Sequence, residues 1–481
     1  MNSSEDNSVA KPSPGRWRFV RRVLVSVAVL ATLVAIFYAE ENWRGKRAWE
    51  KCKRELEAKG MDFNWNALIP PPVPDGQNFF KAPKMAEWFA RIPGRPPTND
   101  FPGLLAPPNS GVKSIEVDAV QTEQDARNHL AWSDPLQPDF ELIREALSRP
   151  YARIEGDYSQ PMTMPMVNFA ALRTVTLILA QRTRCYLMLG EPDKALKELT
   201  LIHDLRRILK GEPTGKPMTL VAAMIDVAIT GHYVSAVADG LRMNAWREQQ
   251  LVELQRQLSE INLTPMLASA FQYEQVASAW ALETLSRREL VKLLTPSMGP
   301  PHETALFFTK YAPRGWFYQN MVSSARLARP FSDAFNVTNQ TVSPHNLDES
   351  TRAIQDAIER NFRHNFLTSL AMPNFVKAVQ TFARNQTSAN EAAVACGLER
   401  YRLAKAEYPE TLNALAPQFI TKVPQDVIGQ PFKYRRTDRG KFLLYSVGWN
   451  ETDESGETAW TKDTMPRVDV AKGDWAWPPA K

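Results

Sequence analysis

Hydrophobic residues form an unbroken stretch close to the start of the chain. From Val23 to Ala39 the sequence reads VLVSVAVLATLVAIFYA and contains no charged residue, proline or glycine. A helix of roughly 17–25 apolar residues crosses a bilayer, and helical hydrogen bonding satisfies the backbone there. The pattern therefore predicts one N-terminal transmembrane helix at residues 23–39.

Charged residues differ on the two sides of this segment. The basic residues that precede it are Lys11, Arg16, Arg18, Arg21 and Arg22. Glu40 and Glu41 follow it, although further basic residues between Arg44 and Arg47 reduce the contrast. Because positively charged flanks stay in the cytoplasm, we expect residues 1–22 to be a cytoplasmic basic tail. The protein would then sit in the bacterial inner membrane, with its bulk extracytoplasmic.

A cleaved signal peptide is the alternative, since such peptides also combine a basic start with an apolar stretch. Cleavage requires small residues at the last and third-last positions, and cleavage after Ala39 would place Phe37 third from the end. We therefore expect an uncleaved anchor. No other stretch predicts a second span, so the protein would be single-pass.

The pattern changes twice after the anchor. Trp49, Cys52 and Leu56 recur at helical spacing, which predicts a stalk helix within residues 40–64. Residues 65–110 are rich in proline, which lacks an amide donor and disfavours helix, so they predict an extended linker or strap. Aromatic residues there indicate a strap packed on the next domain, among them Phe79, Phe80, Trp88 and Phe89.

Helical periodicity dominates a domain that we place at residues 111–350. The helices expected within it are at residues 168–189, from Pro192 onward, and at about 216–241, 245–260 and 264–290. Between Thr295 and Ser350 the pattern fades into what reads as loops and short helices.

The last region, residues 351–481, combines the spacing of an amphipathic helix with the alternation of β-strands. Val394, Leu398 and Tyr401 share one helix face. Apolar and polar residues then alternate after Phe432 and again after Phe442, which predicts two strands. The expected arrangement is one helix packed on a small antiparallel sheet.

Three stretches carry a family resemblance: LAMPNFVKA (370–378), LERYRLAKAEYPETLNALAPQFITKVPQDVIGQPFKYR (398–435) and FLLYSVG (442–448). Through them, residues 366–460 resemble the major pseudopilin of bacterial type II secretion. The resemblance implies a small α+β pilin-type C-terminal domain, following a mainly α extracytoplasmic domain. The whole chain also looks like bacterial single-pass envelope proteins that have no assigned activity.

The chain departs from the pseudopilin pattern at its N-terminus. The family's peptidase site is a Gly followed by Phe or Met, with a Glu at the fifth mature position. Here Gly15 is followed by Arg16, and Val20 occupies the fifth position. The anchor also lies far before the domain. We therefore expect a pilin-type fold used as a soluble module and not as a filament subunit.

The resemblance also implies a calcium loop after the LYSVG strand. That loop reads GWNETDESGE, and its candidate ligands are Asn450, Asp453 and Glu454. Clustered oxygen ligands suit calcium, which takes six to eight of them. However, the family's first acidic ligand aligns with Asn450, and its usual glycine pattern is absent. A solvated acidic turn is the alternative.

Composition excludes several classes of protein. The net charge is 58 − 53 = +5, which is too mild to predict a nucleic-acid partner. The 44% hydrophobic and 23% charged residues are ordinary globular usage. Three widely separated cysteines (Cys52, Cys185 and Cys396) form neither a disulfide framework nor a zinc site. No cofactor is predicted apart from the possible calcium ion.

Candidate catalytic groups are sparse. The sequence contains no Walker loop, dinucleotide fingerprint, zinc-protease motif or nucleophile elbow. His203-Asp204 reads as a surface pair. Glu274 and Glu283 lie nine residues apart on one predicted helix, roughly 13 Å, which is too far for a retaining glycosidase.

The remaining candidates have structural explanations. Asp226 and Arg173 each interrupt an apolar helix, and we expect them to form a buried pair. Three tryptophans near the end would pack the tail on the domain, with sugar stacking as the alternative: Trp460, Trp475 and Trp477.

Three functions remain open on this pattern. The first is a structural or interaction protein with envelope protein partners, such as secretion or pilus-type machinery. The second is an envelope enzyme with a site in the helical domain. The third is a calcium-responsive module.

Overall fold

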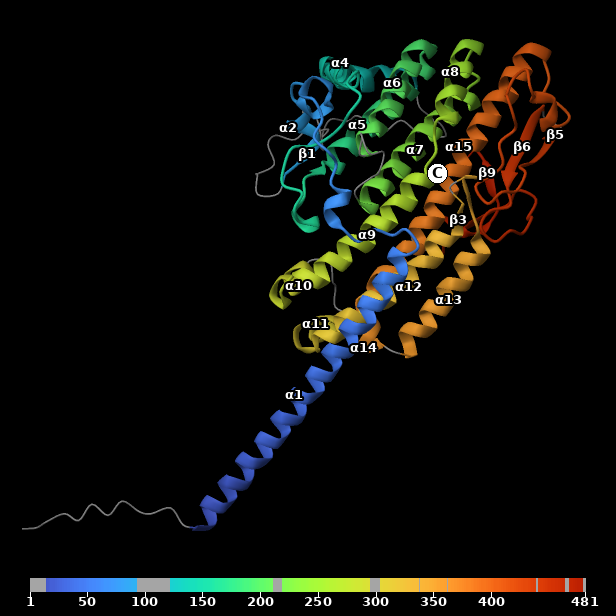
Figure 1. Cartoon of the computed structure of the whole chain (residues 1–481). Coiled ribbons are helices and arrows are strands. Elements are labelled where there is room, and N and C mark those ends of the chain that lie inside the picture. The colour runs from blue at the N-terminus through green and yellow to red at the C-terminus, as the bar shows by residue number, and fades with distance from the viewer. Residues whose placement is uncertain are drawn as a thin grey trace, which may run out of the picture.

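The computed structural model describes residues 14–92, 122–210, 219–294, 303–336, 338–360, 362–437, 440–462 and 467–478. One long helix, α1 (Pro14–Glu57), projects from a mainly helical body with short antiparallel sheets (Figure 1). Several expected segments lie outside the described residues: most of the basic tail (1–13), the second part of the proline-rich segment with the start of the helical domain (93–121), and residues 295–302.

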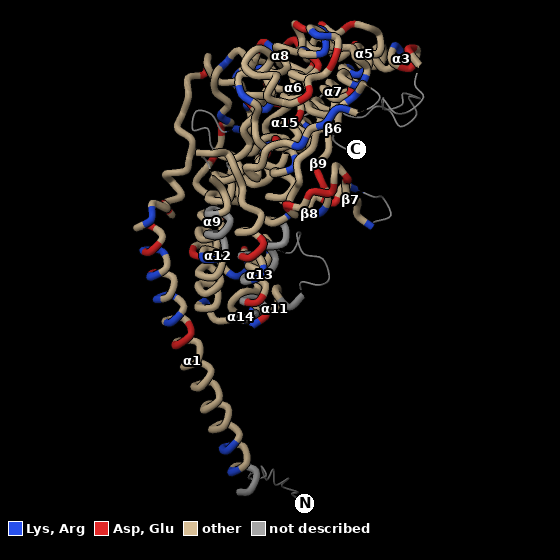
Figure 2. Tube along the Cα trace, turned by 90° about the vertical axis from the view of Figure 1, so that its right-hand side faces the viewer, with Lys and Arg blue, Asp and Glu red and all other residues tan. Residues whose placement is uncertain are grey.

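Helix α1 joins the expected anchor and the expected stalk without a break. The apolar side chains up to Phe37 are exposed, whereas one face from Glu41 onward packs on α12 (Arg314–Ala334). Figure 2 shows an uncharged middle of α1 between a basic end and a charged part beside the body. An exposed apolar row of this length is costly in water. The helix is apolar enough to span a membrane, as predicted.

A second helix also meets the length and composition of a membrane span, contrary to our expectation. It is α7 (Leu220–Arg242), in which 56% of the most apolar window is buried inside the body. Its neighbours there include α5 (Phe169–Met188), α9 (Thr264–Thr284) and α15 (Thr368–Lys405). The apolar character of α7 thus serves the core of the body.

The described part of the proline-rich segment wraps the body as a strap. Its elements are η1 (Trp65–Leu68), η2 (Asp75–Gln77), η3 (Phe79–Lys81), α2 (Met85–Phe89) and β1 (Ala90–Arg91), which pairs with β2 (Met166–Val167). Phe79, Phe80, Trp88 and Phe89 are buried in the main core, which confirms the packed strap.

The helical domain follows the predicted order in its first half. Its further elements are α3 (Glu123–Ser133), η4 (Asp134–Leu136), α4 (Gln137–Ala146), η5 (Pro161–Thr163), α6 (Pro192–Leu205), η6 (Arg206–Leu209), α8 (Glu248–Ser259) and α10 (Arg287–Leu294). Local signals set the boundaries: the Asn168 side chain accepts a hydrogen bond from the Ala171 amide and so caps α5. Gly190, in the left-handed region, separates α5 from α6.

Two expectations for this domain were wrong. The helix expected at 264–290 is interrupted after Thr284, and α10 continues separately. The described residues between 303 and 350 are not mainly loops, because they contain α11 (Glu303–Tyr311), the 21-residue α12 and the start of α13 (Pro344–Arg360). A short hairpin of β3 (Phe335–Asn336) and β4 (Thr341–Val342) separates α12 from α13.

The C-terminal region contains the expected helix and antiparallel strands. Its elements are α14 (Phe362–Asn365), α15, η9 (Leu412–Leu415), β5 (Lys433–Thr437), β6 (Lys441–Ser446), β7 (Thr458–Trp460), β8 (Val468–Gly473) and β9 (Trp475–Trp477). The strands form one sheet in the order β5-β6-β9 and a separate β7-β8 pair. Trp475 and Trp477 are buried as predicted, but Trp460 is 48% exposed and does not pack the tail down.

Helix α15 connects the two expected domains. It packs on α7 and α8 and also contacts β6, β8 and β9. One hydrophobic cluster accordingly runs from Phe79 in the strap to Trp477 in the last strand. The surface between α8 and the C-terminal loops is thus built on a continuous core.

Candidate functional site

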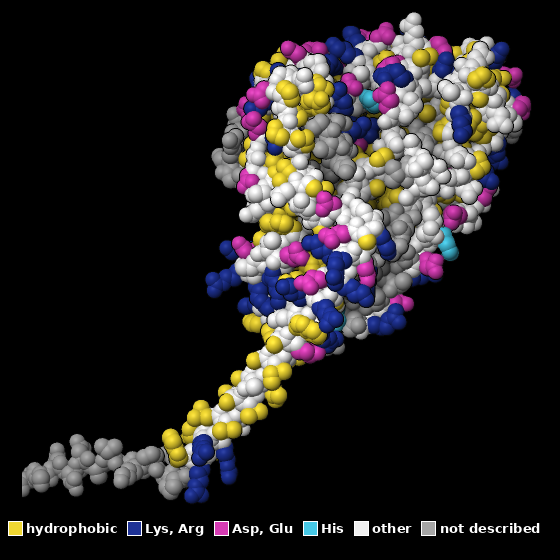
Figure 3. All heavy atoms as spheres, in the orientation of Figure 1, with side chains coloured by type: hydrophobic (Ala, Val, Ile, Leu, Met, Phe, Trp, Pro, Cys, Tyr) yellow, Lys and Arg dark blue, Asp and Glu magenta, His cyan; other side chains and the backbone are white. Residues whose placement is uncertain are grey.

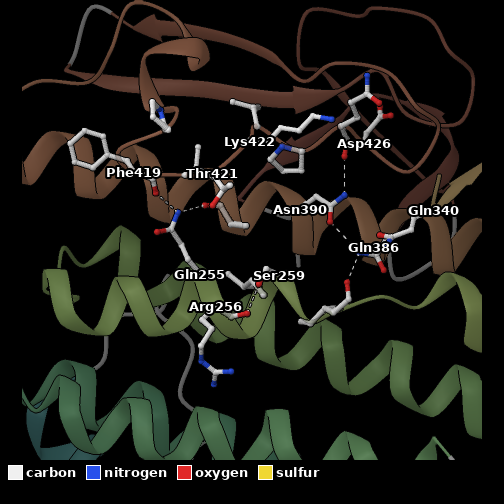
Figure 4. A pocket seen from close by; sticks show the side chains of 18 of the residues that line it. Gln255, Arg256, Ser259, Gln340, Gln386, Asn390, Phe419, Thr421, Lys422 and Asp426 are labelled. Atoms are coloured by element: carbon white, nitrogen blue, oxygen red, sulfur yellow. Dashed lines mark hydrogen bonds between the residues drawn. The ribbon is translucent and has the colours of Figure 1, made fainter. Parts of the chain in front are cut away.

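A polar cavity of about 620 Å³ lies where α8 meets the C-terminal region. Helices α8 and α15 form two of its sides, and residues 339–341 and the segment 417–426 close the others (Figure 4). In Figure 4 Gln255 and Ser259 come from α8, Gln386 and Asn390 from α15, and Thr421 and Lys422 from the opposite segment.

Amide side chains hold these elements together. Gln255 Nε2 donates to the main-chain oxygens of Ala393 and Phe419, both at 3.2 Å. Asn390 Nδ2 donates to the Gln425 oxygen at 2.8 Å. These bonds join α8, α15 and the 417–426 segment directly, so the shape of the cavity is fixed from within.

Gln386 belongs to the same wall and is buried. It accepts a hydrogen bond from the Leu263 amide at 2.8 Å and donates to the Ile261 oxygen at 2.9 Å and to Asn390 Oδ1 at 3.1 Å. The amide thereby ties α15 to the connection between α8 and α9.

Three cations border the cavity. Arg400 donates to Gln255 Oε1 and to the Phe419 oxygen, and it pairs with Glu248 at 2.8 Å. Arg256 pairs with Glu253 and Glu260, and Figure 4 shows its guanidinium turned away from the opposite segment. Lys422 is exposed on that segment. The surroundings of the cavity are therefore polar, and carboxylates match the charges of the two arginines.

Two buried carboxyl groups lie beside the cavity. Burial raises the pKa of Asp426 to about 6, although hydrogen bonds from Ser446 and the Gln430 amide oppose the shift. Burial also raises the pKa of Glu391 well above its usual range, and the Arg384 charge opposes this. Burial therefore favours the protonated form of Glu391.

The lining residues are mainly amide, hydroxyl and apolar side chains. Among the described residues that line the cavity, Asp426 is the single carboxylate, and none is histidine or cysteine. Asp426 is already held by Ser446 and Gln430. General acid–base or nucleophilic chemistry needs a reactive group within reach of a substrate, whereas amides and hydroxyls bind polar main chains.

The calcium candidates are engaged by other groups of the chain. Asp453 accepts from the Tyr445 hydroxyl at 2.9 Å and pairs with Lys433 at 3.4 Å. Asn450 Nδ2 donates to Glu454 at 2.7 Å and so presents a donor where a cation needs an oxygen. Across the described residues, no group of three or more His, Cys, Asp or Glu side chains is placed to hold a metal ion.

A different carboxylate lies beside this loop. Asp474, just before β9, is fully buried and accepts from the Gly456 amide at 2.6 Å. Burial raises the pKa of Asp474 to about 6, with the nearby Glu454 carboxyl adding to the shift and the amides of Gly456 and Glu454 opposing it. Figure 2 shows acidic residues gathered beside β7 and β8. The sequence pattern missed Asp474 because this residue lies outside the loop. Strand β8 brings the chain back so that Asp474 lies beside the loop.

The buried Asp–Arg pair exists, but the predicted partner was wrong. Asp226 accepts from Arg206 Nε at 2.5 Å and from Arg206 Nη2 at 3.0 Å, and both side chains are buried. Arg173 is exposed on α5. The pair joins η6 to α7 inside the core. Neither residue lines the cavity, so the role of the pair is structural.

The other candidates are also engaged structurally. Glu274 accepts from the Leu220 amide at the start of α7, and Glu283 accepts from Trp49 Nε1 on α1. His203 lies beside Asp204 at 3.1 Å and Glu260 at 3.5 Å. None of these groups lines the cavity.

Sequence patterns overlooked the cavity residues for a physical reason. Gln255 and Arg400 look like solvent-facing positions on separate helices. One signal was present: the polar run NQTSAN at 385–390 interrupts the apolar pattern of α15. A comparison with protein-family models, with characterised proteins and with solved structures finds no match to this chain.

Proposed function

We propose that this chain is a single-pass protein of the bacterial inner membrane that binds another envelope protein on the extracytoplasmic side. The apolar part of α1, residues 23–39, would be the anchor, with the basic tail in the cytoplasm. The C-terminal region would be a pilin-type module, and secretion or pilus-type machinery is the expected partner class. Nucleic acid is not an expected partner.

The observation that carries this proposal is the polar cavity between α8, α15 and the 417–426 segment. In the part of the chain that the structure describes, the main-chain amides of Thr421, Lys422 and Val423 donate no hydrogen bond. An extended peptide binds by pairing its main chain with such groups, while polar side chains fix its position. An extended segment of the partner is therefore the favoured occupant.

Site-specific photo-crosslinking in intact cells tests this proposal. A photoreactive amino acid at Val252, an exposed residue that lines the cavity, is expected to give an adduct of defined mass. The variant Ser259→Trp should abolish the adduct, because the indole would fill the space between α8 and the opposite segment. The same probe at Arg127, exposed on α3, is the control. No adduct from Val252, or equal adducts from both positions, would contradict the proposal.

Calcium binding is a second candidate, favoured by one observation. Glu454 Oε2 and Asp474 Oδ1 are buried. Among the described residues, no donor lies in hydrogen-bonding geometry to either oxygen. Two carboxyl groups that share a site retain either a proton or a cation. These two residues, rather than Asp453, would hold a calcium ion and supply a stabilising link between the loop and β9.

Thermal unfolding of the full-length protein tests this candidate. Calcium should raise the unfolding midpoint more at about pH 8 than at about pH 5, because bound calcium requires both carboxylates deprotonated and Asp474 titrates near pH 6. Asp474→Asn should remove the effect, while Asp453→Asn should retain it. Equal midpoints with calcium and with chelator at both pH values would eliminate the candidate.

A further inference from the structure

The end of the body from which α1 emerges carries an unusual set of side chains. Helices α10, α11 and α14 lie at this end (Figure 1). On α11, Phe307 is 58% exposed and Tyr311 is 51% exposed, and their rings lie 5.0 Å apart. Leu293 on α10 is also exposed. Large apolar side chains exposed together mark an interaction surface.

Direct contacts fix the position of this surface along α1. The Tyr38 hydroxyl donates to the Tyr311 main-chain oxygen at 2.5 Å. One turn further on, the Gly315 amide donates to Asn42 Oδ1 at 2.8 Å, and Trp316 Nε1 donates to Glu41 at 2.8 Å. Tyr38 belongs to the last turn of the apolar segment 23–39. The C-terminal end of α11 therefore lies at the height where the anchor leaves the hydrocarbon.

Basic residues lie on the same two helices as the exposed apolar side chains, together with the exposed Glu289 on α10. Arg288 and Lys292 are exposed on α10, and Lys310 is exposed on α11 with its ammonium 5.3 Å from the Tyr311 ring. Figure 3 shows Lys and Arg side chains, interspersed with Asp and Glu, at this end of the body next to the apolar row of α1. Aromatic residues with neighbouring cations suit the headgroup layer of a membrane, where rings meet the acyl boundary and cations meet phosphate.

The packing beneath the surface keeps it in place. Leu290 and Ala305 are buried with Phe317 and Phe366 in one cluster, so α10 and α11 pack on α12 through their opposite faces. Arg314 also donates to the Leu282 and Leu285 oxygens at the end of α9. The exposed side chains thus project from elements that are rigidly joined to the anchor.

We infer that α10 and α11 form a lipid-facing surface that rests in the outer headgroup layer of the bilayer that α1 spans. Leu293, Phe307 and Tyr311 enter the interface, and Arg288, Lys292 and Lys310 bind lipid phosphates. The body is then held against the membrane at two places and cannot swing freely about α1. This inference rests on the proposed membrane span.

Spin labelling of the full-length protein in phosphatidylcholine–phosphatidylglycerol vesicles tests the inference. Labels are placed singly by Leu293→Cys and Phe307→Cys, and the native cysteines do not compete because all three are buried. Trp460→Cys, an exposed aromatic position on β7, is the matched control, and Val29→Cys reports the anchor. We expect several-fold lower collision with a water-soluble nickel chelate at positions 293 and 307 than at position 460.

Each other outcome overturns a defined statement. Equal nickel accessibility at positions 293, 307 and 460, with position 29 protected, overturns the lipid-facing surface alone. Accessibility at position 29 as well would overturn the membrane span and the inference with it. The variant Arg288→Glu/Lys292→Glu/Lys310→Glu should raise accessibility at position 307, and an unchanged value would show that the cations do not bind phosphate.

Discussion

The variant Asp226→Ala is expected to lower the free energy of unfolding by about 3–5 kcal/mol. The change removes the carboxylate that receives two hydrogen bonds from Arg206, whose side chain is only 2% exposed. The guanidinium would remain buried without its counter-charge, and water cannot reach it to compensate. Chemical denaturation followed by circular dichroism measures the loss.

Two further variants test whether the loss comes from the unpaired Arg206 charge or from any change in the core. Arg173→Ala should change stability by less than about 0.5 kcal/mol, because Arg173 is exposed. The double variant Arg206→Met/Asp226→Leu should recover much of the loss by replacing the ion pair with packed apolar groups. A large effect of Arg173→Ala alongside the loss from Asp226→Ala would favour the partner inferred from sequence, and a small effect of Asp226→Ala would contradict a buried pair altogether.

Gly315→Val is expected to separate α12 from α1. A Cβ at Gly315 would lie 1.8 Å from the Glu41 main-chain oxygen, and one at Gly45 would lie 2.2 Å from the Gly315 oxygen. Both close neighbours are backbone, so neither can rotate away. We expect a stability loss of about 3 kcal/mol, the upper end of the usual range for overpacking.

Hydrogen exchange across α1 and α12 measures this separation directly. Amides of α12 and of the second half of α1 should exchange much faster in Gly315→Val than in the unaltered protein. Gly76→Val is the matched control, since nothing lies within 4 Å of a Cβ there. Unchanged exchange in α12 would show that α1 and α12 stay packed at a larger separation, which would contradict the prediction.

Local signals in the sequence predicted much of the helical body. Asn168 before an apolar run, and Gly190 with Pro192 between two such runs, marked α5 and α6 because capping and turn chemistry act over a few residues. Helix α12 was overlooked although its buried apolar residues recur at helical spacing. Phe317, Met321 and Ala325 lie four residues apart on one face, where Phe317 packs with Phe366 and the other two pack in the cluster that contains Trp49.

The candidate site was less predictable, because it depends on contacts between distant segments. The sequence favoured Arg173 for Asp226 because both interrupt apolar helices, and only the packing of η6 on α7 selects Arg206. Gln255 meets Phe419 across 164 positions, and no periodicity encodes that pairing. Glu454 meets Asp474 only because β8 and β9 bring the chain back to the loop.

Orientation across the membrane tests the central claim most directly. Two single-cysteine variants are used: Ser3→Cys in the basic tail and Lys405→Cys at the solvent-exposed end of α15. Intact spheroplasts that carry each variant are treated with a membrane-impermeant maleimide. The account predicts that position 405 reacts before lysis and that position 3 reacts only after it. Labelling of position 3 in intact spheroplasts, with position 405 protected until lysis, would contradict an anchored body on the extracytoplasmic side.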